Sequence, residues 1–358
     1  MQILAVDIGT GMQDILLFDT ERGPTRMSLP SPTALLARAI QAATRRGDHL
    51  YLSGVTMGGG PCAQAVRHHI EAGYRVYAAA QVAHTFADSL DAVRAMGIDI
   101  VSESTRPANV VHLQMCDLDL AAIERAFMAI GVPARPDALA LAVFDHGVAR
   151  AAQAGDQPRL AHLHERLAAT PTLTGMIHTR ADIPADLPRM RAVTLSAPPT
   201  LPLIVMEPAF AALLGAWQDP TLQDVRDLAM IHLGNMHTLA VHLVDERIVG
   251  LFEHHTEQLT SGRLDALIGA LLEGRLSPQD GCADGGHGAL VLDATPHQAE
   301  CLAVTGPKSN LLYGLRYKPH FATPYGDADA AGCWGLIHAY AALHPEASAQ
   351  IESALSHL

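Results

Sequence analysis

The sequence predicts a two-lobed α/β fold in which one motif occurs twice. Residues 3–19 are predicted to form two short apolar strands joined by Gly9-Thr10-Gly11, and residues 230–245 repeat this pattern around Gly234-Asn235. Between the two hairpins, segments typical of strands and helices alternate, as in α/β proteins. A chain of 358 residues, 49% of them hydrophobic, is long enough to bury the cores of two domains.

The composition restricts the partners and the compartment. A formal net charge of −13 disfavours nucleic acid and anionic membranes, because phosphate groups would be repelled. The five cysteines are scattered singly without a CxxC motif, which favours reduced thiols. No export segment opens the chain, and no apolar run reaches the roughly 18–20 residues of a membrane span. We expect a cytoplasmic protein that acts on a small molecule, and the sequence does not indicate an oligomeric state.

The first hairpin has the chemistry of a phosphate site. Gly9 and Gly11 allow backbone N–H groups to approach an anion, and Thr10 adds a hydroxyl donor. Asp7, at the end of the strand, can hold Mg²⁺ directly or through water. An ordinary hairpin in which Asp7 caps a turn explains this stretch equally well on its own.

The elements after the first hairpin continue the α/β pattern. Residues 32–46 predict a helix after Ser31, residues 50–79 a βαβ unit with a glycine run at 58–60, and residues 86–98 a further helix. Residues 138–144 predict a buried strand that ends at Asp145, a place where α/β proteins form sites. Prolines interrupt residues 151–200, which we interpret as an insertion or lid.

The order of the later motifs resembles the actin, sugar-kinase and heat-shock-chaperone ATPase superfamily. Besides the two hairpins, Glu207-Pro208-Ala209 begins a small-residue helix like the first connector between lobes, and 327–339 is similar to the second connector. The segment Ala303 to Lys308 resembles the adenosine-side motif, although Pro307 replaces a glycine. The resemblance implies a two-lobed actin-like ATPase (ribonuclease H-like) fold with a nucleotide cleft. It implies an N-terminal lobe at 1–205 that includes the insertion 151–200, a C-terminal lobe at 206–329, and a C-terminal helix at 330–358 that returns to the first lobe.

The resemblance also implies roles for single residues. ATP would lie between the lobes, with Asp7 and Glu207 managing metal and water and with Asp145 as a base for an acceptor. Glu207 has a simpler explanation as a carboxylate at a helix N-terminus. The expected contacts to the nucleotide are Gly9, Thr10, Gly11, Gly234, Asn235, His237, Thr238, Gly306, Pro307 and Lys308.

The second hairpin departs from the superfamily pattern. His232 stands where an aspartate is usual, and His237 stands where a glycine is usual. An imidazole is a poor ligand for Mg²⁺ but suits Zn²⁺, Fe²⁺ or Ni²⁺. We therefore predict either Mg²⁺ or a transition metal, with ligands among Asp7, His232, His254, His255 and His287. His254 and His255 point to opposite faces if the strand continues through them, so that both could bind one ion only where the strand has ended.

Within the superfamily, the chain most resembles an uncharacterised group with a Gly-Asn-x-His-Thr hairpin and a Glu-His-His-Thr strand end, here 234–238 and 253–256. Some catalogues label this group as pyruvate formate-lyase activating enzymes. Radical chemistry of that kind needs a cluster of three cysteines, which the spacing of the five cysteines does not supply, so we reject the label for this chain.

Three functions fit these observations. The favoured one is an ATP-dependent phosphotransferase or ATPase that transfers phosphate to a small molecule or activates it. The second is a metal-dependent acyl or carbamoyl transferase that uses the same cleft. The third is a scaffold that closes on a nucleotide without chemistry.

Overall fold

The first lobe is built on a six-stranded sheet. The computed structural model describes residues 1–148, 158–277, 280 and 286–358. Strands β1, β2 and β3 form an antiparallel meander, and β8 and β10 continue the sheet parallel to β1, with β9 antiparallel at its edge. The bounds are β1 (Gln2–Ile8), β2 (Met12–Asp19), β3 (Gly23–Pro30), β8 (Ala138–Val143), β9 (His178–Thr179) and β10 (Leu203–Met206).

The second lobe repeats the order of five of these strands, from β3 to β10. Its sheet runs β14-β13-β12-β11-β15-β16, where β11, β12 and β13 form the meander and β15 and β16 run parallel to β11. The bounds are β11 (Asp227–Leu233), β12 (His237–Val244), β13 (Arg247–His255), β14 (Gly286–Val291), β15 (Cys301–Thr305) and β16 (Pro319–Phe321). The same order in both halves confirms the predicted two-lobed actin-like fold, and β3, which we did not predict, completes the first meander.

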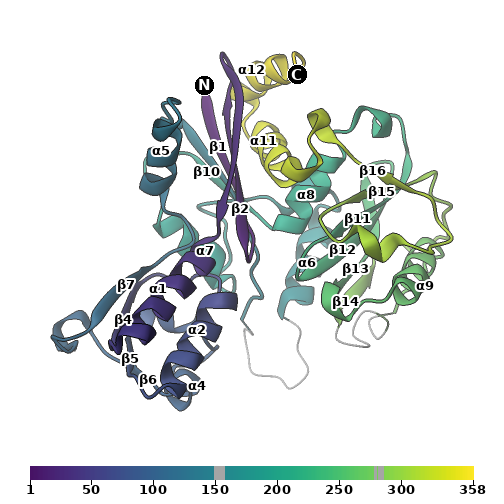
Figure 1. Cartoon of the computed structure of the whole chain (residues 1–358). Helices are drawn as coiled ribbons and strands as arrows, with labels where there is room; N and C mark the ends of the chain where they lie inside the picture. The colour runs from purple at the N-terminus through teal and green to yellow at the C-terminus, as the bar shows by residue number, and fades with distance from the viewer. Residues whose placement is uncertain (149–157, 278–279, 281–285) are drawn as a thin grey trace.

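Two helices rich in small residues lie between the lobes (Figure 1). They are α8 (Pro208–Ala216) and α11 (Ala331–Leu343), and both pack into one core with residues of the two large sheets. A Cβ atom added to Gly335 would lie 1.8 Å from the Ala211 carbonyl oxygen, and one added to Gly215 would lie 1.8 Å from the Ala331 oxygen. The two helices therefore touch through their backbones, which explains the small-residue composition of both segments.

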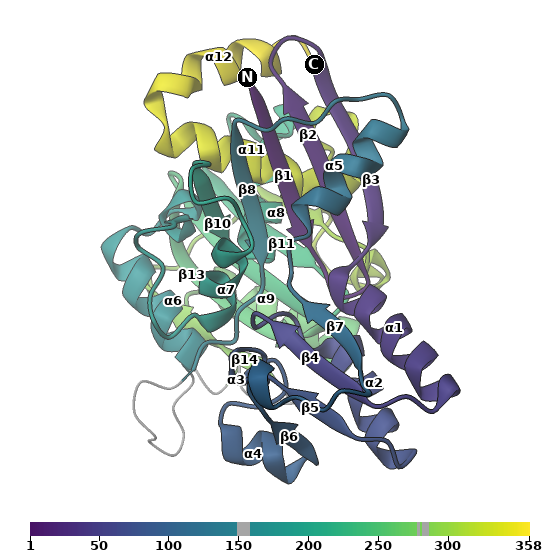
Figure 2. The same cartoon turned by 90° about the vertical axis from the view of Figure 1, so that its left-hand side faces the viewer.

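A small sheet extends the first lobe beyond the carboxyl end of β1 (Figure 2). Its four parallel strands have the order β6-β5-β4-β7. The strands are β4 (Leu50–Gly54), β5 (Val76–Ala78), β6 (Ile98–Ile100) and β7 (Val111–Met115), and the helices beside them are α1 (Pro32–Arg46), α2 (Gly60–Glu71), α3 (Ala80–Ala83) and α4 (Leu90–Ala95).

The predicted helix over 32–46 and the βαβ unit over 50–79 are confirmed. The predicted helix over 86–98 is wrong in extent, because the Ser89 hydroxyl caps a short helix that begins at Leu90 and Gly97, at φ +90°, follows its end.

The remaining helices cover the sheets. Residues of α5 and α7 pack on one face of the first large sheet, and residues of α9 pack on the second. They are α5 (Leu120–Ala129), α6 (Pro158–Ala169), α7 (Pro188–Leu195), α9 (Ser261–Leu272) and α12 (Pro345–Leu355). Short 3-10 helices span Glu103–Thr105, Leu173–Met176, Pro220–Leu222, Thr256–Gln258, Ser309–Leu312, Pro324–Gly326 and Ala328–Ala330. Within the described residues, none of the helices has the length and apolar character needed to cross a membrane.

Candidate functional site

Asp7 lies near the carboxyl end of β1 and faces a second carboxylate. It is directly opposite Asp14 on β2, and a Cβ atom on Gly332 at the start of α11 would lie 2.1 Å from its Oδ2 atom. Burial, and then the charge of Asp14, raise the pKa of Asp7 to about 7. A carboxyl group in this position gains a proton easily, and a cation that binds there would relieve the repulsion from Asp14.

The turn that follows Asp7 is exposed, and hydrogen bonds from Ser31 fix its conformation. The Ser31 hydroxyl donates to the Thr10 carbonyl oxygen at 2.7 Å, and the Ser31 N–H donates to the Gly11 carbonyl oxygen at 3.0 Å. Gly60, at the start of α2, approaches the Thr10 side chain so closely that a Cβ atom there would lie 3.1 Å from Thr10 Cγ2. The Gly9-Thr10-Gly11 turn therefore lies beside the first turns of α1 and α2.

His232 occupies in the second lobe the place that Asp7 occupies in the first. Each residue is the last but one of its central strand, with Asp7 opposite Ala142 on β8 and His232 opposite Thr305 on β15. Burial lowers the pKa of His232 to about 4, and its Nδ1 atom has no hydrogen-bond partner among the described residues. The second hairpin thus presents a neutral imidazole where the first presents a carboxylate.

The predicted adenosine-side segment lies next to the second hairpin. Gly306 has φ +102°, and a Cβ atom on it would lie 2.5 Å from the Leu233 carbonyl oxygen. The Lys308 N–H donates to the same oxygen at 3.1 Å. Asn235 is exposed, whereas the buried Thr238 hydroxyl pairs with the Thr256 hydroxyl at 3.0 Å. Thr238 is one of the predicted nucleotide contacts, but its side chain points into the protein.

The ends of the first-lobe strands meet the second hairpin. Phe144, directly after β8, stacks on His237 at the start of β12, with ring centroids 4.1 Å apart and planes 3° apart. Ile8 pairs with Val143, the neighbour of Phe144. Both glycine-containing turns therefore lie on the same side of the molecule, at the carboxyl end of β8.

Both carboxylate oxygens of Asp145 accept hydrogen bonds from backbone N–H groups. Its Oδ1 atom accepts the Gly147 N–H at 2.9 Å, and its Oδ2 atom accepts the N–H groups of Arg189 and Met190, at 2.8 and 2.9 Å, in the first turn of α7. Burial raises its pKa, and these backbone donors oppose that rise. The contacts are those of a helix-capping carboxylate, so a role as general base stays a prediction that the geometry does not favour.

Glu207 shares a buried arginine with Glu253. Both guanidinium ends of Arg159, on α6, donate to the two Glu207 carboxylate oxygens, and Arg159 Nε donates to Glu253 Oε2 at 2.6 Å. The three side chains are nearly sealed from solvent, at 6%, 3% and 1% exposure for Arg159, Glu207 and Glu253. Burial raises the pKa of Glu207, against the attraction of Arg159. Glu207 is therefore committed to an ion pair, and its predicted role in orienting water would require that pair to open.

Three histidines of the second lobe converge beside Phe144. Each of the three side chains, His237, His255 and His287, offers one ring nitrogen. These three nitrogens lie within 4.8 Å of one another. The ring centroids are 5.1 Å apart for His237 and His255, 5.0 Å for His237 and His287, and 4.2 Å for His255 and His287. His146, which is exposed after β8, lies 5.9 and 6.2 Å from the rings of His237 and His287.

The predicted metal ligands are thus divided by the structure. His255 and His287 come together, joined by His237, which we had placed only among the nucleotide contacts. His254 is buried on the opposite side of β13 and donates from Nδ1 to the His255 carbonyl oxygen at 2.9 Å. His232 and Asp7 do not belong to this cluster. Arg159 escaped the sequence reasoning, because no local signal marks it. His146 follows Asp145 at the end of the same buried strand, but we gave it no role.

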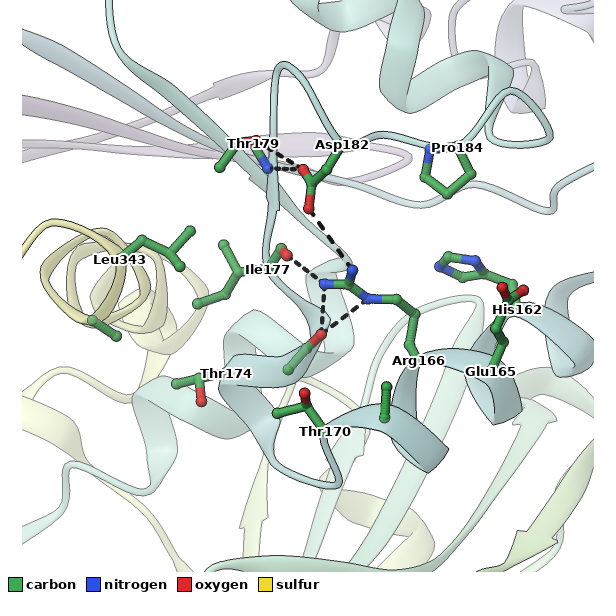
Figure 3. Close-up of a pocket in the computed structure, with 13 residues that line it drawn as sticks. His162, Glu165, Arg166, Thr170, Thr174, Ile177, Thr179, Asp182, Pro184 and Leu343 are labelled. Atoms are coloured by element: carbon green, nitrogen blue, oxygen red, sulfur yellow. Dashed lines mark hydrogen bonds and ion pairs between the residues drawn. The ribbon is translucent and has the colours of Figure 1, made fainter.

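A pocket of about 590 Å³ lies away from these residues. It is enclosed by α6, the 3-10 helix after it, β9 and the end of α11 (Figure 3). The Arg166 guanidinium projects into it but is already bonded to the Gly175 and Ile177 carbonyl oxygens and lies 3.8 Å from Asp182. None of the predicted site residues lines this pocket.

A family model matches residues 57–311, most of the chain. Its description is "Putative pyruvate format-lyase activating enzyme (DUF1786)". The chain belongs to this family. Within the described residues, the free thiols lie on α2 (Cys62), after β7 (Cys116), on β15 (Cys301) and on α11 (Cys333), so the iron–sulfur chemistry that the family label suggests has no cysteine cluster there. Cys282 lies outside the described residues.

Several solved structures match the chain at low identity and low TM-score. A ROK hexokinase from Thermus thermophilus is 13% identical with a TM-score of 0.36, covering 96% of this chain and 100% of its own. A ROK-family glucokinase from Streptomyces griseus, in complex with glucose and AMPPNP, is 13% identical with a TM-score of 0.35, covering 94% and 98%. The AlfA filament protein from a B. subtilis plasmid is 9% identical with a TM-score of 0.34, covering 94% and 98%. No curated protein matches the chain significantly. At these TM-scores the likeness carries no functional argument, and the fold depends on the strand order described above.

Proposed function

We propose that this protein is an enzyme that binds ATP between its two lobes and uses it to phosphorylate or activate a small molecule. The observation that carries the proposal is the stacking of Phe144 on His237. Because of this contact, both glycine-containing turns lie at the carboxyl end of β8. Two such turns, one from each lobe, suit the two ends of a polyphosphate chain. The third candidate, a scaffold that closes without chemistry, would have the same binding site.

The roles within the proposal follow from the first hairpin. The exposed turn Gly9-Thr10-Gly11 would supply backbone N–H groups and one hydroxyl to the phosphates. Asp7 would hold Mg²⁺, because it is the carboxylate of the cleft without a hydrogen-bonded partner among the contacts described above. Gly306, which packs against the Leu233 backbone, and Lys308 would border the nucleotide beside the second hairpin. Closure of the lobes would bring these groups onto one ligand.

Ligand-dependent stabilisation tests the binding step. ATP with Mg²⁺, at about 100 times its dissociation constant, should stabilise the folded state by about 2.7 kcal/mol. For a chain of this length we expect a rise in Tm of about 3–5 °C. Asp7→Asn should abolish the part of the rise that depends on Mg²⁺, whereas Asp99→Asn, on the exposed edge of the small sheet, should retain it. An unchanged Tm in the wild-type protein would refute nucleotide binding.

An activity measurement separates the enzyme from the scaffold. ATP turnover that is lost in Asp7→Asn and raised by a phosphate acceptor would support phosphoryl transfer. Stabilisation by ATP without turnover, in the presence of candidate sugars and carboxylates as acceptors, would favour the scaffold.

A second candidate function is metal-dependent acyl or carbamoyl transfer. The observation in its favour is that His232 replaces the carboxylate of the second hairpin while three further imidazoles gather at the start of β12 and the end of β13. In this case ATP would activate the acyl group and a transition metal would bind the activated substrate. Metal content, measured on protein without a histidine tag, distinguishes this candidate from the first.

The proposal includes the division of the chain into lobes at 1–205 and 206–329, with 330–358 returning to the first lobe. Limited proteolysis should then release fragments that end near these boundaries, and ATP should slow the cleavage because closed lobes protect the connectors. Cleavage that starts inside the large sheets would refute the division.

A further inference from the structure

We infer that His237, His255 and His287 form a binding site for one divalent transition-metal ion, for which Zn²⁺ is the reference, with an open position toward the first lobe. This inference deepens the second candidate function but does not depend on nucleotide binding. It differs from the ligand set expected from the sequence, because it leaves out His232, His254 and Asp7 and adds His237.

The distances between the rings fit a common ion. In a tetrahedral site with Zn–N bonds of about 2.0–2.1 Å, ligating nitrogens lie about 3.3 Å apart and the ring centroids lie about 5 Å apart. Two of the three centroid distances, 5.1 and 5.0 Å, match this value, and the third, between His255 and His287, is shorter at 4.2 Å. Since the nitrogens already lie within 4.8 Å of one another, small rotations of the side chains bring them into coordination distance.

The sheet register explains why these three side chains meet. His237 pairs directly with His255 across β12 and β13, so both side chains leave the sheet on one face. The register between β13 and β14 shifts between Glu253 and His254, where Glu253 pairs with Gly288 and His254 with Gly286. His287 therefore lies in this bulge, and its ring turns to the side of His255. Bulges of this kind redirect side chains beside functional sites.

The nitrogen atoms of the cluster lack other partners. The Nε2 atoms of His237 and His287 are sealed from solvent, and neither has a hydrogen-bond partner among the described residues. An unpaired buried polar atom is unfavourable, and a bound metal ion would satisfy both nitrogens together. Neutral imidazole is the form of histidine that binds such an ion.

The charges around the cluster suit a cation despite the nearby arginine. Arg159 contacts Phe144, with its guanidinium carbon 4.2 Å from the ring centre, and Phe144 in turn stacks on His237. Two carboxylates, Glu207 and Glu253, hold this single guanidinium, and Glu253 Oε1 has no partner among the described residues. The ion triad therefore contributes more negative than positive charge, and Glu253 points to the same face of β13 as His255.

Three protein ligands leave one coordination position for water or substrate, as in catalytic zinc sites. His146 of the first lobe lies beside two of the three rings. Its ring is 5.9 Å from His237 and 6.2 Å from His287, about 1 Å farther than a ligating ring, and its exposed side chain can move. His146 can thus contact the fourth ligand, or replace it when the lobes close.

Metal titration of the untagged full-length protein tests the inference. After removal of metal with a chelator, Zn²⁺ alone is added in competition with a chromogenic chelator, in the absence of nucleotide. We expect one ion per chain with a dissociation constant of about 1 µM or lower. His255→Ala and His287→Ala should each weaken binding at least about 100-fold, more than a change in the surrounding shell would. His68→Ala, at an exposed position on α2, should change nothing.

Cobalt substitution and folding controls make the result decisive. Co²⁺ in the wild-type protein should give the intense visible bands of four-coordinate cobalt, and His146→Ala should leave the affinity within about tenfold. Circular dichroism and Tm in the presence of chelator should match between the wild type and each variant, and His287→Gln replaces His287→Ala if that variant does not fold. Binding weaker than about 1 mM, or equal affinity in the wild type and folded His255→Ala, would overturn the inference. Because no nucleotide is present, either result leaves the ATP proposal standing.

Discussion

Replacing Arg159 with methionine is a direct test of how the site is held together. Methionine retains much of the aliphatic volume of arginine but removes the charge that Glu207 and Glu253 share. Those two carboxylates are 3% and 1% exposed, so neither can recover its lost partner from water without a rearrangement.

Removing one member of a buried ion pair destabilises proteins by about 3–5 kcal/mol, because a charge remains buried without compensation. We expect this cost at pH 8 for Arg159→Met. The cost should shrink at lower pH, because a buried carboxyl whose folded pKa is raised above its unfolded value takes up a proton in the folded state first. Folded stability of the variant should therefore fall as the pH rises from the unfolded pKa of a glutamate, about 4.3, through the raised pKa of the folded state.

Urea unfolding followed by circular dichroism measures both quantities. With an m-value of order 3 kcal/mol/M, the midpoint of Arg159→Met should lie about 1 M below that of the wild type at pH 8. Arg38→Met, on the exposed side of α1, should remain within about 0.5 kcal/mol of the wild type. A loss under about 1 kcal/mol, or a loss that is the same at pH 5.5 and pH 8, would show that the triad does not carry the stability reasoned here.

Two further substitutions test other parts of the structure. Gly335→Ala should cost at least about 3 kcal/mol, seen as a lower Tm, because its Cβ would meet the Ala211 carbonyl oxygen at 1.8 Å. Gly262→Ala, where no atom lies within 4 Å of the added Cβ, should instead raise the stability by up to about 1 kcal/mol, and equal effects would contradict the backbone contact. Asp7→Asn should raise the Tm of the ligand-free protein at pH 8 but not at pH 4, because a carboxyl with a folded pKa of about 7 weakens the fold as it ionises between about 3.8 and 7. A Tm of Asp7→Asn equal to that of the wild type at pH 8 would refute the cost of ionising Asp7 where it is buried beside Asp14.

The sequence predicted those features whose signals are local. Both glycine-containing hairpins have strands rich in apolar residues around a turn, and Glu207 to Ala216 combines a proline at the first helical position with small residues. Such patterns depend on neighbours within a few residues. The duplication of the hairpins then predicted the two-lobed fold.

The details of the site depend on contacts that no local pattern encodes. His146 meets His237 because the first-lobe strand ends pack on the second hairpin, across some 90 positions of the sequence. The position of His287 follows from a register shift opposite Glu253, which the alternation of apolar residues does not reveal. Arg159 lies on α6, and its partners are far away in the sequence, directly before α8 and on β13. A free Glu207 and a free Asp145 were natural expectations because the sequence shows carboxylates but not what neutralises them.

The backbone contact between α8 and α11 also determines how this molecule can move. Helices that interlock at Gly215 and Gly335, with no long side chains between them, cannot slide along each other by a turn without a clash. Any relative motion of the lobes is then a rotation about that crossing, with bending at the chain segments that enter and leave the two helices. In such a rotation, atoms at the crossing move least, and atoms far from it move most. The strand ends that carry Phe144 and His237 would separate farther than the helices between the lobes, so a slight swing at the crossing is enough to part the two rings and admit a ligand.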